Sequence, residues 1–172
     1  MITGGAGHLG YAMAESLAEA GASVILLDID VNLARRKADA LKKRYKVKAA
    51  ALAVDLTDDT ACAAVGPQVK KLMGRLDVLI HAAALVGTSH LKGWAVPFKQ
   101  QDLGTWRKAL EVNLTSAFAL AQSCQPLLAQ SKNGSIINIS SIYGVVGPDM
   151  GLYAGTGMGN PAAYAASKGG LV

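Results

Sequence analysis

Short runs of Val, Ile and Leu alternate along the chain with longer segments in which apolar residues recur at helical spacing. The short runs fit strands buried on both faces, and they are SVILL (23–27), KAAALAV (48–54), DVLI (77–80) and SIINI (135–139). The tripeptide MIT at the start lies where a first strand would end. Helical patterns cover 9–20, 31–45, 60–73 and about 105–130. This alternation predicts an α/β fold, a doubly wound parallel sheet with helices on both faces, in one domain over residues 1–172.

The net charge of +5 comes largely from one segment, RRKADALKKRYKVK (35–48). Leu33, Ala40 and Leu41 recur there at the spacing of an amphipathic helix, so the basic residues are interpreted as a solvated helix face and not as a nucleic-acid site. Cys62 and Cys124 have neither a CxxC spacing nor a nearby histidine. They are therefore predicted to be reduced, packed thiols, and no metal site is expected.

The hydrophobic segments are too short for a membrane span, because none reaches the ~20 apolar residues that a bilayer requires. The first residues also lack the basic and apolar regions of a signal peptide. A cytoplasmic location is the expectation. Two connections, 85–101 and 140–160, are long for this kind of fold and are interpreted as a lid or a substrate wall.

The segment TGGAGHLG (3–10) follows the first strand and opens a helix. Glycine permits positive φ angles and lets the backbone approach a pyrophosphate, whose charge is stabilised by the N–H groups and the dipole at a helix start. In this setting the glycines predict a dinucleotide-binding turn, whereas a tight strand-to-helix turn is the simpler alternative. The residues expected to bind the cofactor here are Gly4, Gly7, His8, Leu9 and Gly10.

Asp28 closes the second predicted strand, eighteen residues after Gly10. A carboxylate at this place can accept hydrogen bonds from both hydroxyls of an adenosine ribose, and it repels a 2′-phosphate. Ile29 and Asp30 follow it, so no Arg or Lys stands beside it. The predicted cofactor is therefore NAD rather than NADP.

Two further strand ends are candidates for contact with the cofactor. Asp55 and Leu56 follow the third strand and are expected near the adenine, although an Asp after a strand is usually a helix cap and Asp58 competes for that role. Ala82 and Ala83, in the segment HAAA (81–84), follow the fourth strand with side chains small enough to leave room for a ring. A packed strand end would look much the same.

Tyr164 and Lys168 lie four residues apart in a predicted helix, which places phenol and ammonium on the same face. A nearby positive charge favours the phenolate, so Tyr164 is a candidate general acid/base that exchanges a proton with a carbinol or carbonyl oxygen. Hydride would move to or from a nicotinamide in the same reaction. Ser141, at the end of the fifth strand, is a candidate donor for orienting the substrate oxygen.

Taken together, TGGAGHLG, VILLD, VDL, HAAA, EVNLTSAF, GSIINISS and YAASK resemble the motifs of the short-chain dehydrogenase/reductase family over essentially the whole chain. The resemblance implies a Rossmann-like fold and a small-molecule substrate. It also implies that Asn113 distorts the long helix and holds a proton-relay water, that Ser141 polarises the substrate oxygen, and that Tyr164 is the acid/base. Lys168 would bind the nicotinamide ribose and favour the phenolate. The family habit of pairing its long helix implies a homodimer or homotetramer.

Three features depart from the usual pattern of that family. The glycine turn has the TGxxGxxG spacing of the sugar-nucleotide branch, with His8 where TGxxxGxG has its middle glycine. The usual NNAG is replaced by HAAA, which removes two amides expected to stabilise the sheet centre. The inserted segment PDMGLYAGTGMGNP (148–161) separates Ser141 from Tyr164. With GWAVPF (93–98), it resembles a bacterial subgroup of surface-polysaccharide and flagellin-glycan synthesis, which implies a carbohydrate-derived substrate.

Other functions stay open at this point. TGxxGxxG and HAAA also suit a sugar-nucleotide epimerase or dehydratase, although EVNLTSAF favours the single-domain branch. A nucleotide-binding module without turnover is the non-enzyme alternative. Because the resemblance implies further strands after SIINI, we expect the 172 residues alone to be a fragment that is poorly soluble and inactive.

Overall fold

The computed structural model describes residues 1–86, 89–156 and 158–172. They form two compact units, each described by itself. The first unit is Met1–Ala83 with Phe118–Asn138, and the second unit is Ala84–Ala117 with Ile139–Val172. Gly87 and Thr88 of the predicted lid and Gly157 of the inserted segment lie outside the described residues.

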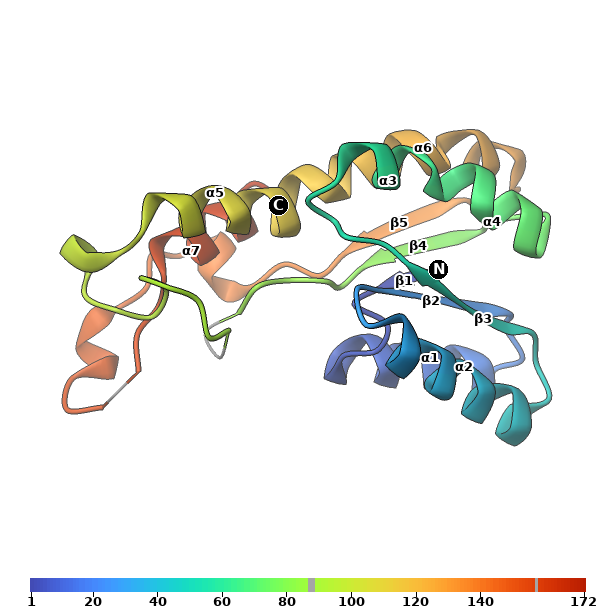
Figure 1. The fold of residues 1–172 in the computed structure, drawn as a ribbon, viewed down its shortest axis with the longest axis horizontal. Coiled ribbons are helices and arrows are strands. Elements are labelled where there is room, and N and C mark those ends of the chain that lie inside the picture. The colour runs from blue at the N-terminus through green and yellow to red at the C-terminus, as the bar shows by residue number, and fades with distance from the viewer. Residues whose placement is uncertain (87–88, 157) are drawn as a thin grey trace. The chain divides into compact units, whose positions relative to one another are not determined.

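The first unit is built on a five-stranded parallel sheet in the order β3-β2-β1-β4-β5. In register, Ile2 of β1 pairs with Leu26 of β2 on one side and with Ile80 of β4 on the other. Helices α1 and α2 cover one face of the sheet, and α3, α4 and α6 cover the other (Figure 1). The doubly wound fold predicted from the alternating pattern is therefore confirmed. The strands are β1 (Ile2–Thr3), β2 (Val24–Asp28), β3 (Ala49–Ala53), β4 (Val78–His81) and β5 (Ser135–Asn138).

Two helices of the first unit follow the predicted boundaries closely, namely α1 (His8–Glu19) and α2 (Val31–Tyr45). The buried residues of α2 are Ala34, Ala38 and Leu41, and most of its basic side chains are exposed. One of them, Arg44, pairs with Glu15 at 3.0 Å. The basic segment is therefore a solvated helix face, as its periodicity predicted.

The single helix predicted over 60–73 is instead two helices, α3 (Asp59–Ala63) and α4 (Val65–Met73). Pro67 causes the break, because a proline ring clashes with the carbonyl four residues earlier, which here belongs to Ala63. That carbonyl accepts a hydrogen bond from the Ser123 hydroxyl at 2.7 Å instead. Gly66 lies against the Ser123 carbonyl, where a Cβ atom would not fit.

The long helix predicted over about 105–130 is interrupted near its centre. It consists of α5 (Leu103–Leu110), a π-helical turn (Glu111–Thr115) and α6 (Ser116–Gln130). The boundary between the two units falls inside α6, after Ala117. Among its described residues, the second unit also contains α7 (Ala162–Gly169) and the short 3₁₀ helices Phe98–Gln100, Ile142–Gly144 and Met150–Tyr153.

The prediction that SIINI is buried on both faces is wrong. Ile136 and Ile137 of β5 are 46% and 44% exposed. In the described structure β5 pairs only with β4, so it has a strand neighbour on one side. Periodicity could not reveal this, because the burial of a strand depends on what the rest of the chain places beside it.

Each unit has its own apolar core. The core of the first unit includes Leu27, Leu79, Leu120 and both cysteines, which are free and buried, as expected for packed thiols. Burial raises the pKa of Cys124 to about 11. The core of the second unit is centred on Trp94, Ala109 and Ala163. None of the helices in the described ranges is long and apolar enough to cross a membrane.

Candidate functional site

The glycine-rich turn connects β1 to α1 in the first unit. Gly4 has a φ of +61°, and a Cβ atom there would lie 2.9 Å from the Cα atom of Ala83. Gly10 lies so close to the Gly4 carbonyl that no side chain would fit. Helix α1 begins at His8, and the first N–H groups of a helix have no acceptor within the helix. Its N-cap is Gly7, which has no side chain to accept a hydrogen bond from them. These N–H groups and the close backbone approach suit a pyrophosphate.

Asp28 fixes this turn as well as closing β2. Its carboxylate accepts hydrogen bonds from the Ala6 N–H at 2.9 Å and from the Asp30 N–H at 3.1 Å. The Ala6 carbonyl in turn accepts a hydrogen bond from the Lys37 ammonium at 2.7 Å. Lys37 also lies 4.4 Å from the centroid of the Tyr11 ring. The sequence shows no basic residue beside Asp28, but the fold brings Lys37 to the carbonyl of Ala6, the residue whose N–H Asp28 binds.

Thr3 joins the ends of β1 and β4. Its hydroxyl oxygen accepts hydrogen bonds from the N–H groups of Ala82 and Ala83, at 3.1 and 3.0 Å, and it lies 3.2 Å from His81 Nδ1. Because both lone pairs of the oxygen are occupied, the hydroxyl proton must point to Nδ1, which is then unprotonated. The resemblance implied that HAAA lacks two side-chain amides that usually stabilise the sheet centre. In this structure the buried side chains of Thr3 and His81 lie at that centre and contact each other.

Asp55 and Leu56 lie after β3, as predicted. The Asp55 carboxylate accepts hydrogen bonds from the N–H and the hydroxyl of Thr57, at 2.9 and 2.8 Å. Asp58 is the N-cap of α3, because its carboxylate accepts a hydrogen bond from the Ala61 N–H at 3.0 Å. The competing cap is therefore Asp58, and the expected contact of Asp55 and Leu56 with an adenine stays a prediction.

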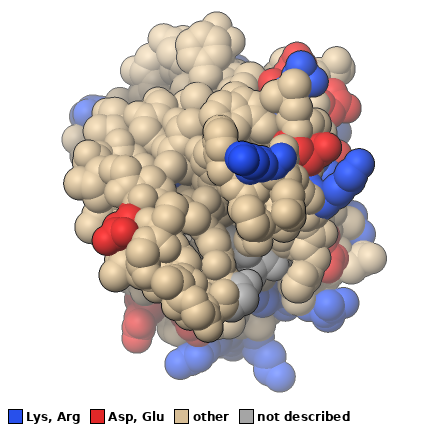
Figure 2. Space-filling view, turned by 90° about the vertical axis from the view of Figure 1, so that its left-hand side faces the viewer, with Lys and Arg blue, Asp and Glu red and all other residues tan. Residues whose placement is uncertain are grey.

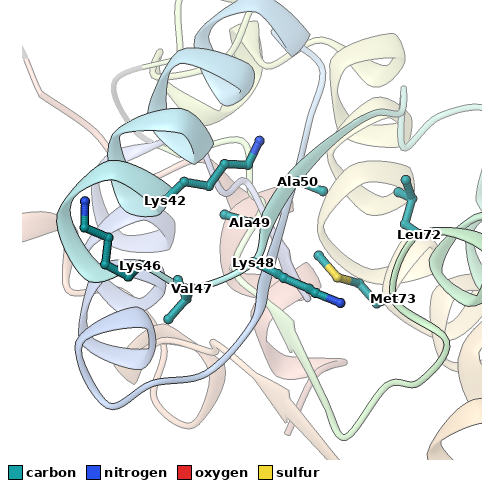
Figure 3. A pocket seen from close by; sticks show the side chains of 8 residues that line it. All are labelled: Lys42, Lys46, Val47, Lys48, Ala49, Ala50, Leu72 and Met73. Atoms are coloured by element: carbon teal, nitrogen blue, oxygen red, sulfur yellow. The ribbon is translucent and has the colours of Figure 1, made fainter.

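A separate pocket in the first unit lies between the end of α2, the start of β3 and the end of α4 (Figure 3). Its lining includes Lys42, Lys46 and Lys48, whose side chains point in different directions (Figure 3). Lys42 pairs with Asp39 at 2.9 Å. The pocket lies at the amino end of β3, whereas ligands of parallel sheets bind at the carboxyl ends of the strands. It is therefore not part of the nucleotide site.

The second unit contains all four residues that the resemblance implies for catalysis. Tyr164 and Lys168 lie one turn apart on α7, and the Lys168 ammonium is 5.9 Å from the centroid of the Tyr164 ring. Lys168 is 2% exposed and donates a hydrogen bond to the Ile139 carbonyl at 2.6 Å. Burial holds the pKa of this ammonium below its ordinary value. The Tyr164 hydroxyl has no hydrogen-bond partner within the described ranges.

Asn113 lies in the π-helical turn between α5 and α6 and is fully buried. Its side-chain oxygen accepts a hydrogen bond from the Leu85 N–H at 2.7 Å, and its amide donates to the Leu85 carbonyl at 3.2 Å. The amide also donates to the Ser167 hydroxyl at 3.0 Å, and Ser167 donates to the Tyr164 carbonyl at 2.8 Å. Asn113 thus connects the π-helical turn to the helix that carries Tyr164. Its expected role in holding a water stays a prediction.

Ser141 begins the 3₁₀ helix Ile142–Gly144 and accepts a hydrogen bond from the Tyr143 N–H at 3.3 Å. The neighbouring Ser140 hydroxyl donates to the Lys168 carbonyl at 2.8 Å. Gly144 packs against the same carbonyl, since a Cβ atom there would lie 2.7 Å from it. These contacts fix the segment that carries Ser141 against α7. The structure therefore brings Asn113, Ser141, Tyr164 and Lys168 into one unit through short connections.

Three connecting residues were missed by the sequence analysis, namely Thr3, Ser140 and Ser167. Each is a hydroxyl with at least one partner far away in the sequence: Thr3 differs from its partners by 78 to 80 in residue number, Ser140 from Lys168 by 28 and Ser167 from Asn113 by 54. A small hydroxyl next to a motif is the only sequence signal, and it is weak because Ser and Thr are common on surfaces.

Comparison with known proteins agrees with this fold. The short chain dehydrogenase family model matches residues 1–172, so the chain belongs to the short-chain dehydrogenase family. Trans-4-hydroxycyclohexanecarboxylate dehydrogenase of Sinomonas cyclohexanicum is 33% identical over an alignment of 177 positions, which covers 99% of this chain and 61% of that protein. The family resemblance inferred from the motifs is confirmed.

Solved structures are similar over nearly the whole chain. Sorbitol-6-phosphate 2-dehydrogenase SrlD of Erwinia amylovora has a TM-score of 0.83 at 30% identity, covering 99% of this chain and 60% of that one. A short-chain dehydrogenase of Escherichia coli CFT073 complexed with NADPH has a TM-score of 0.83 at 29% identity, covering 99% and 66%. The chain spans about three fifths of the length of curated relatives that it matches, 54% to 63% of five of them.

Proposed function

We propose that the whole protein is an NAD-dependent oxidoreductase that transfers a hydride between a nicotinamide and the alcohol or carbonyl carbon of a small molecule. The observation that carries the proposal is the arrangement on α7. A buried ammonium, Lys168, lies one turn from Tyr164, whose hydroxyl is unengaged within the described residues. A phenol beside a buried positive charge is suited to exchange protons at neutral pH.

Each of the four candidate residues of the second unit is given a part in this chemistry. As hydride leaves the carbon of an alcohol substrate, Tyr164 takes the hydroxyl proton, and in the reverse direction it returns that proton. Lys168 favours the phenolate of Tyr164 and is expected to bind the nicotinamide ribose. Ser141 orients the substrate oxygen, and Asn113 supports α7 through Ser167. NAD, when bound, supplies the group that accepts or gives the hydride.

The first unit supplies residues that fit a dinucleotide. Gly4 and Gly10 leave no room for side chains, and the uncapped start of α1 presents N–H groups. Asp28 at the end of β2 is proposed to bind the adenosine ribose, which supports NAD. Lys37 brings a positive charge to the same turn, and a relative is complexed with NADPH. NAD nevertheless stays the proposed cofactor, because the carboxylate of Asp28 closes β2 where a 2′-phosphate would have to bind.

The proposed substrate is a secondary alcohol or the matching ketone. The names of two relatives describe such alcohols, one on a sugar phosphate and one on an alicyclic acid. The loop resemblance favours a carbohydrate-derived substrate, and the SrlD relative supports it. The alicyclic relative supports an apolar alternative.

The experiment is a turnover assay with protein made from the complete reading frame. NAD or NADP is combined with sorbitol 6-phosphate or trans-4-hydroxycyclohexanecarboxylate, and the reduced nicotinamide is followed by its absorbance. We expect reduction of NAD with at least one of these alcohols. Binding of NAD by calorimetry without reduction by either alcohol would instead indicate a nucleotide-binding module without turnover.

We also propose that the whole protein is a homodimer or homotetramer in the cytoplasm. The support for self-association is the apolar long helix, on which Phe118 is 66% exposed and Leu103, in α5, is 60% exposed. Light scattering is expected to give at least twice the mass of one chain, and a monomer mass would contradict the proposal.

A further inference from the structure

The inserted segment between Ser141 and Tyr164 contains a pair of phenols in direct contact. Tyr143 belongs to the 3₁₀ helix that Ser141 caps, and Tyr153 ends the 3₁₀ helix Met150–Tyr153. Their hydroxyl oxygens are 2.8 Å apart. Asp149 caps the second of these helices by accepting a hydrogen bond from the Gly151 N–H at 2.8 Å. The contact between Tyr143 and Tyr153 therefore connects the inserted segment to the 3₁₀ helix that Ser141 caps.

Counting protons shows that this pair is not satisfied by the chain. The Asn160 side chain lies beside the Tyr143 hydroxyl and favours its phenolate, although the hydrogen bond with Tyr153 raises the pKa of Tyr143 overall. If Tyr143 donates to Tyr153, the proton of Tyr153 has no acceptor within the described residues. If Tyr153 donates to Tyr143, the proton of Tyr143 has none. Either way, one O–H donor of this half-buried pair has no acceptor within the described residues.

Asn160 adds a second unsatisfied group at the same place. It is 7% exposed, and its side-chain oxygen has no hydrogen-bond partner in the described part of the chain. Buried polar atoms of native proteins are nearly always paired, so an exception calls for an explanation. A bound molecule that brings its own polar groups to Tyr143, Tyr153 and Asn160 would provide one.

The surroundings of the pair are apolar. Between residues 142 and 160 the only charged residue is Asp149, whose carboxylate already caps a helix. The space-filling view also shows few charged side chains on the face turned to the viewer (Figure 2). Six large apolar side chains of the segment are at least half exposed, namely Ile142, Val145, Val146, Met150, Leu152 and Met158. Exposed apolar groups in such number are typical of a binding surface.

We propose that the Tyr143–Tyr153 pair is a second anchor for the substrate, and that it donates a hydrogen bond to a carboxylate or carbonyl oxygen on a molecule with an apolar body. The inference rests on the proposed function and narrows its substrate to the apolar alternative. A sugar phosphate would find no cation in the described part of this segment to pair with its phosphate. An apolar acid or ester would instead place its body against the exposed aliphatic side chains and its oxygen at the phenols.

The test measures binding and does not depend on turnover. Protein from the complete reading frame, saturated with NAD, is titrated by calorimetry with cyclohexanecarboxylate and with methyl cyclohexanecarboxylate. The variant is the double replacement Tyr143→Phe and Tyr153→Phe, which keeps both rings and removes both hydroxyls. The matched control is Tyr45→Phe on α2, which removes a hydroxyl that contacts Glu15 in the first unit.

We expect the double variant to bind at least one probe about tenfold more weakly, as loss of a hydrogen bond to a substrate oxygen implies, and the control to bind as the unmodified protein does. Weakening for the acid alone identifies a carboxylate, and weakening for both probes identifies a carbonyl oxygen. Equal affinity of the double variant and the unmodified protein, or no binding of either probe to the unmodified protein, overturns the inference. Absence of alcohol oxidation with intact probe binding would count against the proposed function alone.

Discussion

Replacing Thr3 by valine removes one hydroxyl at the centre of the sheet while keeping the shape of the side chain. The hydroxyl oxygen accepts hydrogen bonds from the N–H groups of Ala82 and Ala83, and its proton points to His81. Thr3→Val therefore leaves two N–H groups and one imidazole nitrogen without this partner. The turn that begins at Gly4 packs against Ala83, so the same change should loosen the proposed pyrophosphate site.

The size of the effect follows from the burial of these groups. An unsatisfied buried donor or acceptor costs about 1–3 kcal/mol, but Ala82 and Ala83 are only half-buried, so water can replace part of the loss. We expect a loss of about 2–4 kcal/mol in the free energy of unfolding. For a domain of this size that corresponds to a fall of roughly 5–15 °C in the melting temperature.

The assay is thermal unfolding followed by circular dichroism, together with calorimetric titration of NAD. The control is Thr3→Ser, which keeps the hydroxyl and loses only a methyl group, worth about 1 kcal/mol. NAD affinity should fall severalfold in the valine variant and stay close to normal in the serine variant. A valine variant that melts within about 1 °C of the unmodified protein, or a serine variant that is equally destabilised, would refute the reasoning.

Three further predictions concern charged residues. Burial lowers the pKa of Lys168 in the folded chain. Between that lowered pKa and the ordinary value of about 10.4, the unfolded chain binds more protons than the folded chain does. The free energy of unfolding should therefore rise with pH through this range. Lys168→Met should abolish this rise and should leave the melting temperature at pH 7 unchanged or higher, while turnover is lost. A marked fall in the melting temperature of this variant would contradict the prediction. In the first unit, Asp28→Ala should narrow the preference for NAD over NADP, and Lys37→Met should weaken NADP more than NAD. Equal affinities of the unmodified protein for NAD and NADP in calorimetric titrations would contradict the prediction for Asp28. Unchanged NADP binding by the Lys37→Met variant would contradict the prediction for Lys37.

The fold could be predicted well because hydrophobic periodicity reports directly which residues a sheet and its helices bury. The boundaries of α2 were predicted to the residue, and the parallel order of strands follows from the alternation of elements. The break between α3 and α4 also had a signal, Pro67, which the apolar pattern around it concealed. The burial of β5 had none, because it depends on partners outside the strand.

The candidate site, too, could be predicted from the sequence only in part. The motifs predicted Asp28, Tyr164 and Lys168 as site residues from their spacing. They predicted Ser141 from its place at the end of the fifth strand. The connections among such residues could not be predicted. Lys37 reaches the glycine turn from the next helix, and Tyr153 reaches Tyr143 across the inserted segment. Such contacts join residues whose sequence separation carries no periodic signal, so only the folded chain shows them.

Tyr164→Phe tests the central proposal most directly. The replacement keeps the ring that packs against the core of the second unit and removes only the hydroxyl proposed to exchange the proton. With protein from the complete reading frame, turnover of the best alcohol substrate and binding of NAD are measured on the same preparation. We predict that turnover falls by at least about a hundredfold, in keeping with loss of a general acid/base, while the affinity for NAD changes by less than about twofold. Retention of most of the turnover by the phenylalanine variant would contradict the assignment of Tyr164 as the acid/base.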